Sequence, residues 1–429
     1  MRIVTLKQYT DEIEKQTSLQ SNDLELDRTV LEIIGTVREN GDQALKSYTE
    51  KFDGIMLEEL TVSAEEFVEA QTLISAEFLG ALRKAKGKIT AFHEVQKEQS
   101  WFINQEKGIV LGQKVTPLES VGIYVPGGKA AYPSTVLMNA IPAKIAGVER
   151  IAMVTPPQQD GKVNPHVLIA AQEAGVDVVY KIGGAQAIAA LAYGTETVEK
   201  VAKITGPGNA FVARAKKWVF GDVAIDMIAG PSEICVVADD SAIPAFVAAD
   251  LLSQAEHDER ATAICVTTSH TFAEALQKEV ANQIERADRQ SIIVTSITDN
   301  GRIILVDSLD EAFDFVNKLA PEHLQLMVEN PMEQLPFIHN AGAIFLGNYS
   351  PEALGDYMAG PNHTLPTSGT SAFSSPLGVY DFMKKSSIIQ YTEAALQDVS
   401  NDIIAIANAE GLTAHANSIQ VRKADQNAK

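Results

Sequence analysis

The feature that most constrains this chain of 429 residues is an alternation of short β-branched runs with helical segments, which starts near residue 109. Residues 121–125, 150–154 and 176–182 have the composition of strands, whereas residues 134–147 and 165–175 have helical periodicity. Parallel neighbours in a sheet need a long crossover, usually a helix. The alternation therefore predicts a mostly parallel sheet with helices on both faces.

A second series of the same kind follows the Gly-Pro pair at residues 230–231. Residues 233–238, 263–267 and 291–295 are expected to be strands, and residues 244–257 are expected to form a helix. Two α/β units of similar pattern predict two sheet domains and are consistent with an old duplication.

Both ends of the chain have helical patterns instead. A helix is expected over residues 22–41, and one long helix over residues 67–94 after a capping box at residues 63–66. The charged tail after residue 382 is also expected to be helical. The sequence therefore predicts an α/β fold with helical appendages at its two ends.

Charge and composition exclude some classes of partner. The chain has 56 Asp and Glu against 35 Lys and Arg, a formal net charge of −21, which repels nucleic acid and anionic membranes. No apolar run approaches the roughly 18 residues that span a bilayer, and the first residues lack the apolar core of a signal peptide. Cys235 and Cys265 lie in apolar runs without the spacing of a thiolate metal site. We therefore expect a cytoplasmic protein with two buried thiols, bound to neither nucleic acid nor membrane.

Three glycine-rich turns are candidate ligand sites, although the Gly-x-Gly-x-x-Gly dinucleotide motif is absent. The turns occupy residues 126–128, 183–186 and 206–209, and each follows an expected strand and precedes an expected helix. Backbone N–H groups at such helix starts bind phosphate, and open sheets bind ligands at the carboxyl ends of their strands. The alternative is that these segments are only tight loops between strand and helix.

Several polar residues could bind a metal ion. Gln254 and His257 are three residues apart on an expected helix, so their side chains share one face. Asp356, His363 and the later pair Glu410 and His415 lie in polar loops or near a helix end. Gln254, His257, Asp356 and His415 together form a nitrogen and oxygen donor set suited to zinc or a similar ion, with water or substrate completing the site. Alternatively, each group is a solvated polar segment.

The adjacent pair Glu322 and His323 lies between an expected helix and an expected strand. A carboxylate and an imidazole differ in intrinsic pKa, which suits a reaction with two kinds of proton transfer. A Glu-His dipeptide is common, so the pair alone does not establish catalysis.

These segments occur together, in the same order, in one known family. The sequence resembles the histidinol dehydrogenases over nearly its whole length, most densely between residues 121 and 415. The segments that carry this resemblance are residues 121–128, 183–192, 206–212, 226–233, 250–257, 321–324, 355–367 and 412–415.

The resemblance implies two incomplete Rossmann-like parallel-sheet domains with helical N-terminal and C-terminal appendages. It implies an N-terminal helical segment (1–20), a first α/β domain with the metal and catalytic residues (21–120 plus 232–380) and an NAD-binding α/β domain (121–231). Residues 381–429 would form a helical tail that reaches the partner subunit.

The resemblance also implies a reaction and its residues. The family oxidises L-histidinol to L-histidine through L-histidinaldehyde with two NAD, at the end of histidine biosynthesis, as a zinc-dependent homodimer with one Zn²⁺ per shared active site. The implied roles are catalytic bases Glu322 and His323; NAD contacts Tyr124, Gln186 and Asn209; zinc ligands Gln254, His257, Asp356 and His415; and substrate contacts Ser232, Gln254, His257, His323, Asp356, His363, Glu410 and His415.

Two other functions are weighed against this expectation. One is a zinc- and NAD-dependent dehydrogenase of another small alcohol, which turnover of histidinol against simple diols would distinguish. The other is a non-catalytic metal- or nucleotide-binding protein, which would be expected to lack Glu322 or His323, and both are present.

Overall fold

The computed structural model describes residues 1–17, 24–104, 106–127 and 131–424. The chain forms two compact units, a first unit of Met1–Gln96 and Leu118–Phe382, and a second unit of Lys97–Pro117 and the chain from Met383 onward. No helix in the described part of the chain is both long and apolar enough to cross a lipid bilayer.

The first unit contains a five-stranded parallel sheet in the order β6-β5-β4-β7-β8. Its strands are β4 (Ser120–Tyr124), β5 (Arg150–Val154), β6 (Val178–Tyr180), β7 (Lys203–Thr205) and β8 (Ala224–Ile225). The connecting helices are α5 (Pro133–Ala146), α6 (Pro165–Ala174), α7 (Gly184–Tyr193) and α8 (Ala210–Val219). Counted along the chain, the strand order is 3-2-1-4-5, that of a dinucleotide-binding sheet.

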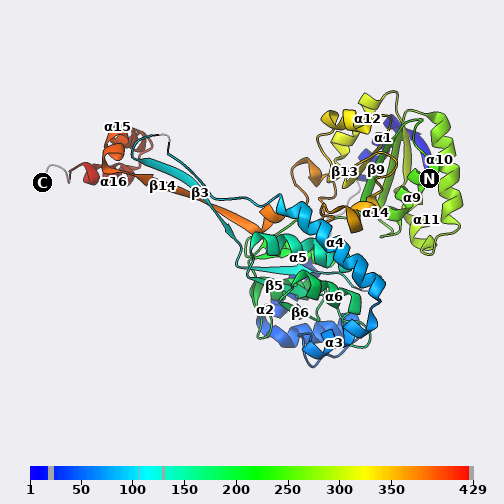
Figure 1. Cartoon of the computed structure of the whole chain (residues 1–429), viewed down its shortest axis with the longest axis horizontal. Helices are drawn as coiled ribbons and strands as arrows, with labels where there is room; N and C mark the ends of the chain where they lie inside the picture. The colour runs from blue at the N-terminus through cyan, green and yellow to red at the C-terminus, as the bar shows by residue number, and fades with distance from the viewer. Residues whose placement is uncertain (18–23, 105, 128–130, 425–429) are drawn as a thin grey trace. The chain divides into compact units, whose positions relative to one another are not determined.

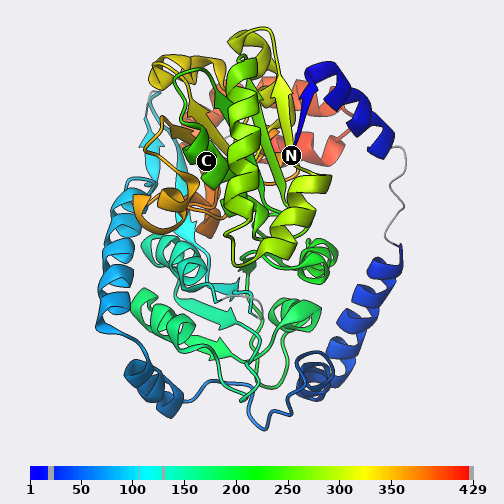
Figure 2. The same cartoon turned by 90° about the vertical axis from the view of Figure 1, so that its right-hand side faces the viewer.

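The first unit also contains a six-stranded parallel sheet in the order β1-β11-β10-β9-β12-β13 (Figure 2). Its strands are β1 (Arg2–Thr5), β9 (Glu233–Ala238), β10 (Thr262–Thr267), β11 (Arg302–Leu305), β12 (His323–Met327) and β13 (Ala343–Leu346). Its longer helices are α9 (Pro244–Ala255), α10 (His270–Ile284), α11 (Gln290–Asp299) and α12 (Leu309–Leu319). From β9 onward the order is again 3-2-1-4-5, which confirms the two predicted Rossmann-like sheets.

Shorter elements and the N-terminal helices complete the first unit. The helices are α1 (Leu6–Thr17), α2 (Leu24–Asp53), α3 (Ala64–Leu73), α4 (Ala76–Glu94), α13 (Pro331–Gln334) and α14 (Glu352–Leu354). The short turns are η1 (Leu335–Phe337), η2 (Gly355–Ala359), η3 (Thr370–Ala372) and η4 (Val379–Phe382). In Figure 1, α3 and α4 lie beside the helices of the five-stranded sheet, and they pack against α6 and α5.

Helix α2 packs on α7 and α8 and belongs to the core of the five-stranded sheet. Val30, Ile33 and Val37 are buried on one stripe of α2, as the helical period requires. Helix α7 lies close to the sheet because Gly122 leaves room for Leu191: a Cβ atom on Gly122 would stand 2.7 Å from Leu191 Cδ1. This packing holds the last turn of α7 against the middle of β4.

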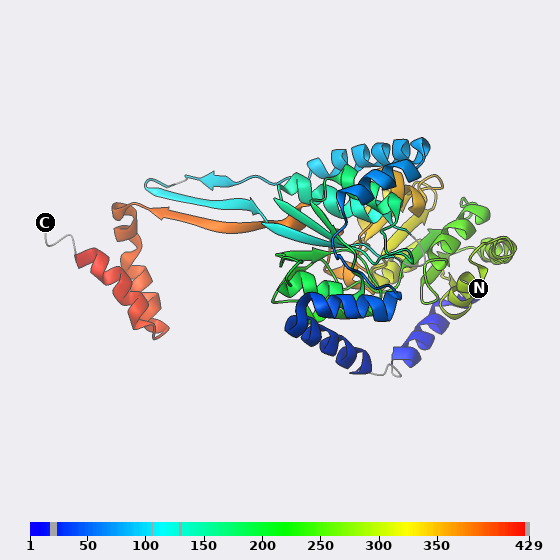
Figure 3. The same cartoon turned by 90° about the horizontal axis from the view of Figure 1, so that it is seen from below.

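The second unit is a three-stranded antiparallel sheet with two helices (Figure 3). Its strands are β2 (Trp101–Ile103), β3 (Ile109–Pro117) and β14 (Met383–Tyr391), and its helices are α15 (Glu393–Ala409) and α16 (Thr413–Ala424). β3 and β14 form a long ribbon, in which Met383 pairs with Pro117 and Tyr391 with Ile109. Trp101, Phe102 and Ile389 remain exposed on this sheet.

Two predictions for the chain ends are wrong in detail. The N-terminal hundred residues include a strand, β1, which joins the edge of the six-stranded sheet by pairing with β11. The tail after residue 382 starts with the nine-residue strand β14 rather than a helix. Both strands pair with segments hundreds of residues away, so local periodicity does not reveal them.

Three further elements differ from the expectation. Residues 291–295 lie in helix α11 because Ile293 and Ile297, four residues apart, are both buried in the core. The expected single helix over 67–94 is two helices, since Ile74 is extended and Ser75 caps α4. The expected helix end at residue 41 is a kink inside α2, where Gly41 adopts a φ of 51°. The predicted capping box at Ser63 is confirmed. The predicted domain boundaries stay a prediction.

Candidate functional site

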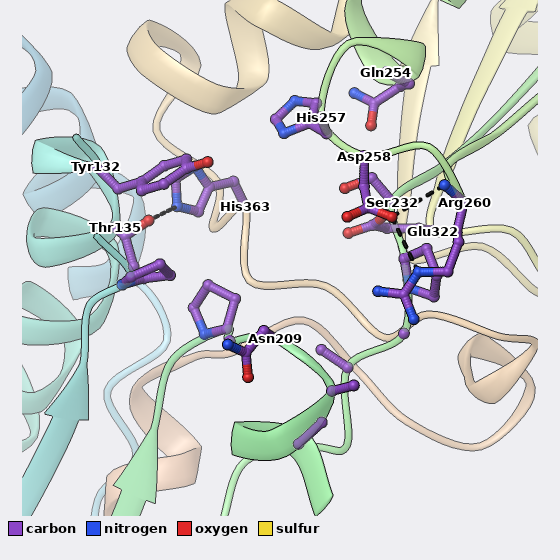
Figure 4. Close-up of a pocket in the computed structure, with 18 of the residues that line it drawn as sticks. Tyr132, Thr135, Asn209, Ser232, Gln254, His257, Asp258, Arg260, Glu322 and His363 are labelled. Carbon is purple, nitrogen blue, oxygen red and sulfur yellow. Dashed lines mark hydrogen bonds and ion pairs between the residues drawn. The ribbon is translucent and has the colours of Figure 1, made fainter. Parts of the chain in front are cut away.

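A pocket of about 470 Å³ in the first unit brings together groups from both parallel sheets (Figure 4). The five-stranded sheet contributes the carboxyl ends of its strands, with Pro126 after β4 and Asn209 after β7. The six-stranded sheet contributes the amino ends of β9 and β12, with Ser232 and Glu322. The pocket therefore lies between opposite edges of the two sheets.

Glu322, just before β12, and His323, its first residue, are held by the start of β9. The backbone N–H of Glu233 donates to Glu322 Oε2 at 2.9 Å. The ring Nδ1 of His323 lies 2.9 Å from the carbonyl oxygen of Glu233. Ala320, with a φ of 47°, ends helix α12 and turns the chain into this strand. The adjacent carboxylate and imidazole are thus oriented by backbone groups rather than by flexible side chains.

His323 is arranged to act as a neutral base. A carbonyl oxygen can only accept a hydrogen bond, so Nδ1 carries the proton and Nε2 presents a lone pair. Nε2 is buried and has no hydrogen-bond partner among the described residues. Burial lowers the pKa of His323 below its usual value, since the charged form is poorly solvated. The ring is therefore ready to accept a proton or to bind a cation.

Glu322 is surrounded by other carboxyl groups. Burial raises the pKa of Glu322 well above its usual value, and the charges of Glu233, Asp356 and Glu352 raise it further. The hydrogen bond from the Glu233 N–H acts in the opposite direction. A carboxyl group with a raised pKa is a stronger base once ionised, which suits activation of a water molecule.

A second acidic pair, Glu352 and Asp356, lies beside His323. Burial raises the pKa of Glu352 to about 7, and the nearby Asp356 carboxylate adds to this effect. Burial also raises the pKa of Asp356. Asp356 Oδ1 lies 3.7 Å from His363 Nδ1, and Ser253 Oγ donates to Glu352 Oε2 at 3.3 Å.

His363 connects this cluster to the five-stranded sheet. Its Nε2 lies 3.4 Å from the hydroxyl oxygen of Thr135, near the start of α5 (Figure 4). Burial lowers the pKa of His363 to about 4, so its ring is neutral near neutral pH. His363 is therefore a hydrogen-bonding group for a bound molecule rather than a fixed cation.

The donor groups of the pocket fit a divalent cation bound through nitrogen and oxygen. Ligand atoms of His323, Glu352 and Asp356 lie within 4.8 Å of one another. Gln254 is buried, and its Nε2 has no partner among the described residues. The expected helix over 244–257 ends at Ala255, so Gln254 enters the pocket from the last turn of α9 and His257 from the turn that follows (Figure 4). Imidazole nitrogens and carboxylate oxygens suit zinc, and Gln254 can join them through its amide oxygen, because an amide nitrogen only donates hydrogen bonds.

The structure brings most of the residues predicted from the sequence into this pocket. The eight that line it are Asn209, Ser232, Gln254, His257, Glu322, His323, Asp356 and His363. Asn209 also caps helix α8, because its Oδ1 accepts hydrogen bonds from the backbone N–H groups of Phe211 and Val212. Its position at the helix start is therefore fixed.

Tyr124 and Gln186 are buried and are not among the residues that line the pocket. The Tyr124 hydroxyl accepts a hydrogen bond from the backbone N–H of Gly184 at 3.0 Å, which ties the end of β4 to the second glycine turn. Gln186 is buried, and its Oε1 has no partner among the described residues. In the first glycine turn, Gly128 lies outside the described residues.

Glu410 and His415 belong to the second unit. Glu410 follows the last residue of α15, and His415 lies in the first turn of α16. Both side chains are exposed within their unit. Their predicted roles in a shared active site stay a prediction.

Glu352 is the buried acidic residue that the sequence interpretation missed. It lines the pocket and is one of the three clustered donors, together with Asp356. Glu352 and Asp356 are four residues apart, which is the spacing of neighbours on a helical face. That spacing was a usable signal, but the surrounding Pro and Gly residues indicated a loop.

Comparisons with known proteins agree along the whole chain. The family model described as histidinol dehydrogenase matches residues 15–423. The histidinol dehydrogenase of Oceanobacillus iheyensis is 55% identical over 428 residues, which cover 100% of both proteins. That of Bacillus subtilis is 54% identical over 423 residues, or 99% of each. The crystal structure of histidinol dehydrogenase from Elizabethkingia anophelis is 41% identical, with a TM-score of 0.91, covering 95% of this chain and 94% of that one.

Proposed function

Because the chain belongs to the histidinol dehydrogenase family, we propose that it oxidises L-histidinol to L-histidine through L-histidinaldehyde, reducing two NAD in a zinc-dependent reaction. The observation that carries the proposal is the Glu322 and His323 pair, oriented by Glu233 and facing a pocket lined by both sheets. This is the four-electron oxidation that ends histidine biosynthesis.

We assign the zinc ion to Gln254, His257 and Asp356, with His415 as the fourth ligand. The support is that Gln254, His257 and Asp356 line the same pocket, and that Asp356 is one of three clustered donor residues there. When bound, zinc supplies a positive charge that holds the amine and imidazole nitrogens of histidinol in place. His323 and Glu352 lie close enough to Asp356 to influence that ligand directly.

In the first oxidation, His323 takes the hydroxyl proton of histidinol as the hydride leaves the same carbon for NAD. The unpartnered Nε2 atom supports this role, because Nδ1 already donates to Glu233. The products are the aldehyde, NADH and a proton held on His323.

In the second oxidation, Glu322 removes a proton from a water molecule that attacks the aldehyde carbon, and the proton held on His323 passes to the aldehyde oxygen, which completes the hydrate and leaves His323 neutral again. His323 then takes a hydroxyl proton of the hydrate as a second hydride leaves for a second NAD. The product is the carboxylic acid. The burial of Glu322 and His323 keeps bulk water away from the reactive aldehyde between the two steps.

The direct test counts NADH released per histidine formed when purified protein is given L-histidinol and NAD. We expect two NADH per histidine and little turnover of simple diols. A ratio of one, or faster turnover of another alcohol, would instead support a dehydrogenase of a different small alcohol.

We also propose a homodimer in which Glu410 and His415 serve the active site of the other subunit. The exposed apolar residues of the second unit, including Trp101, Phe102 and Ile389, support an interface there. Two inactive variants, His323→Asn and His415→Asn, should complement each other after unfolding, mixing and refolding. Random pairing of the two chains should restore roughly a quarter of wild-type activity. Recovery at background level would place His415 in the site of its own chain.

A further inference from the structure

The side chain of Glu233 takes no part in the proposed proton transfers, although its backbone holds both catalytic residues. Glu233 is the first residue of β9 and is not among the described residues that line the candidate active-site pocket. Its N–H donates to the Glu322 carboxylate, and its carbonyl oxygen accepts from the His323 ring, each at 2.9 Å. The position of this one residue therefore decides the direction of both catalytic groups.

Glu233 lies at the open end of the ladder between β9 and β12. The paired register of these two strands starts at Ile234 and His323, one residue further along β9. On its other side, Glu233 pairs with Thr262 of β10. The ends of strands fray more readily than their middles, because fewer backbone hydrogen bonds hold them. An additional restraint on Glu233 thus has more effect here than it would inside the sheet.

The Glu233 carboxylate supplies such a restraint by binding the loop of residues 366–369. The backbone N–H of Ser368 donates to Glu233 Oε1 at 2.9 Å. Burial raises the pKa of Glu233, and the hydrogen bond from Ser368 acts in the opposite direction, so this bond favours the carboxylate form. Ser368 has a φ of 56°, which is uncommon for a residue with a side chain and persists only where the surroundings hold it. Glu233 and Ser368 therefore hold each other in place.

A second hydrogen bond of the 366–369 loop offers a matched comparison. The backbone N–H of Gly230, three residues before Glu233, donates to Thr367 Oγ1 at 2.6 Å. A Cβ atom on Gly230 would collide with the side chain of Ser368, so the loop lies directly against this segment. Thr367 thus ties the loop to the chain before β9, whereas Ser368 ties it to the residue that holds the catalytic pair.

We propose that Glu233 is a positioning residue, whose carboxylate accepts from Ser368 and thereby fixes the peptide groups that orient Glu322 and His323. The inference rests on the proposed function, because it adds a residue to that reaction. A displacement of about 1 Å in a catalytic group can slow a reaction roughly 10²-fold. Loss of the Ser368 hydrogen bond should therefore slow the oxidation of the alcohol and of the aldehyde alike, with little effect on binding.

Two conservative variants separate the hydrogen bond from the charge. Glu233→Gln removes the charge but keeps an oxygen that can accept from Ser368, whereas Glu233→Asp keeps the charge on a side chain one methylene shorter. We expect Glu233→Asp to lower kcat for L-histidinol and for L-histidinaldehyde roughly 10-fold or more, with KM and the Kd for NAD within roughly threefold of wild type. Glu233→Gln should retain most of the activity. The opposite order, or no loss in either variant, would overturn the proposal.

Thr367→Val is the matched control, because it breaks the other hydrogen bond of the same loop and nearly keeps the shape of the side chain. It should lower the melting temperature but leave kcat near the wild-type value, since the bond that it removes is to Gly230 rather than to Glu233. If Thr367→Val slowed the reaction as much as Glu233→Asp, the loop would be a structural support only, and the assignment to Glu233 would fail.

A second measurement needs no turnover. The hydrogen bond to the Glu233 carbonyl places the ring proton of His323 on Nδ1. Nitrogen-15 NMR of histidine-labelled protein distinguishes this tautomer from the one with the proton on Nε2, and the spectrum of His323→Asn identifies the signal. We expect the Nδ1–H form in the wild type and in Glu233→Gln, and a mixture of tautomers in Glu233→Asp.

A single Nδ1–H form in all three proteins would refute the positioning role of Glu233. Failure of the wild-type protein to oxidise L-histidinol would instead refute the proposed function, while the tautomer of His323 would still decide whether Glu233 orients that ring.

Discussion

The two parallel sheets of the first unit share one strand order but use opposite edges. The five-stranded sheet presents its carboxyl edge to the candidate active site, through the turns after β4 and β7. The six-stranded sheet presents its amino edge, where Glu322 precedes β12 and His323 begins it. Strand order alone therefore does not determine which edge of a sheet carries function.

Local chemistry accounts for this difference. At the carboxyl edge of the six-stranded sheet, Asp239 accepts hydrogen bonds from the backbone N–H groups of Ser241 and Glu329, which bridges the ends of β9 and β12. The usual ligand crevice is thus occupied by the protein's own carboxylate. In the five-stranded sheet, the corresponding turn after β7 contains Gly206, whose φ is 111° and whose position leaves no room for a side chain beside the Tyr124 carbonyl.

The largest effect is expected from removing the metal, which on this account serves only the amino edge of the six-stranded sheet. Full chelation should abolish NADH release from L-histidinol, and added Zn²⁺ should restore it. Binding of NAD measured by calorimetry should change little, since the residues predicted to contact NAD lie on the other sheet. Full activity of metal-free protein would contradict the assigned role of Gln254, His257 and Asp356.

The next effect is expected from His323→Asn. Loss of the base should lower kcat by roughly 10²- to 10⁴-fold while leaving the Kd for NAD near its wild-type value. His339→Asn, at an exposed position of the same unit, is the control and should leave kcat unchanged. If His323→Asn lowered the affinity for NAD as much as it lowers kcat, the two sheets would not be separate in function.

Removal of one partner of the buried ion pair next to the turn after β7 is expected to lower the free energy of unfolding. Lys216 and Asp226 are paired, with side chains 2% and 1% exposed, and Lys216 Nζ also donates to the Gly206 carbonyl at 2.9 Å. Lys216→Met leaves the Asp226 charge unpaired and should lower the free energy of unfolding by about 3–5 kcal/mol in denaturant titrations. Lys217→Met, at the exposed neighbouring position, should have little effect. Equal stability of the two variants would show that the ion pair does not hold this turn.

The smallest effects are expected from removing one helix cap on each of the two sheets. Asn209 caps α8 of the five-stranded sheet, and Ser269 caps α10 of the six-stranded sheet. Each change to alanine should cost about 1 kcal/mol of stability. Only Asn209→Ala should also raise the KM for NAD, because Asn209 lines the candidate active site. The same rise in Ser269→Ala would remove the distinction between the two edges.

The sequence predicted the two sheets because strand and helix periods alternate locally, whereas the roles of Glu322 and His323 were predicted only from the resemblance to a known family. It did not predict β1 or β14, since each depends on a distant pairing partner. Residues that meet through tertiary packing have no shared local pattern to detect.

The central claim is that the amino edge of the six-stranded sheet carries two separable proton-transfer roles. Single-turnover measurements on Glu322→Gln test it most directly, with L-histidinol and L-histidinaldehyde supplied separately. The claim predicts that oxidation of the aldehyde falls by roughly 10²-fold or more, because no carboxylate activates the water, while oxidation of the alcohol is slowed much less. Equal slowing of both reactions would contradict it.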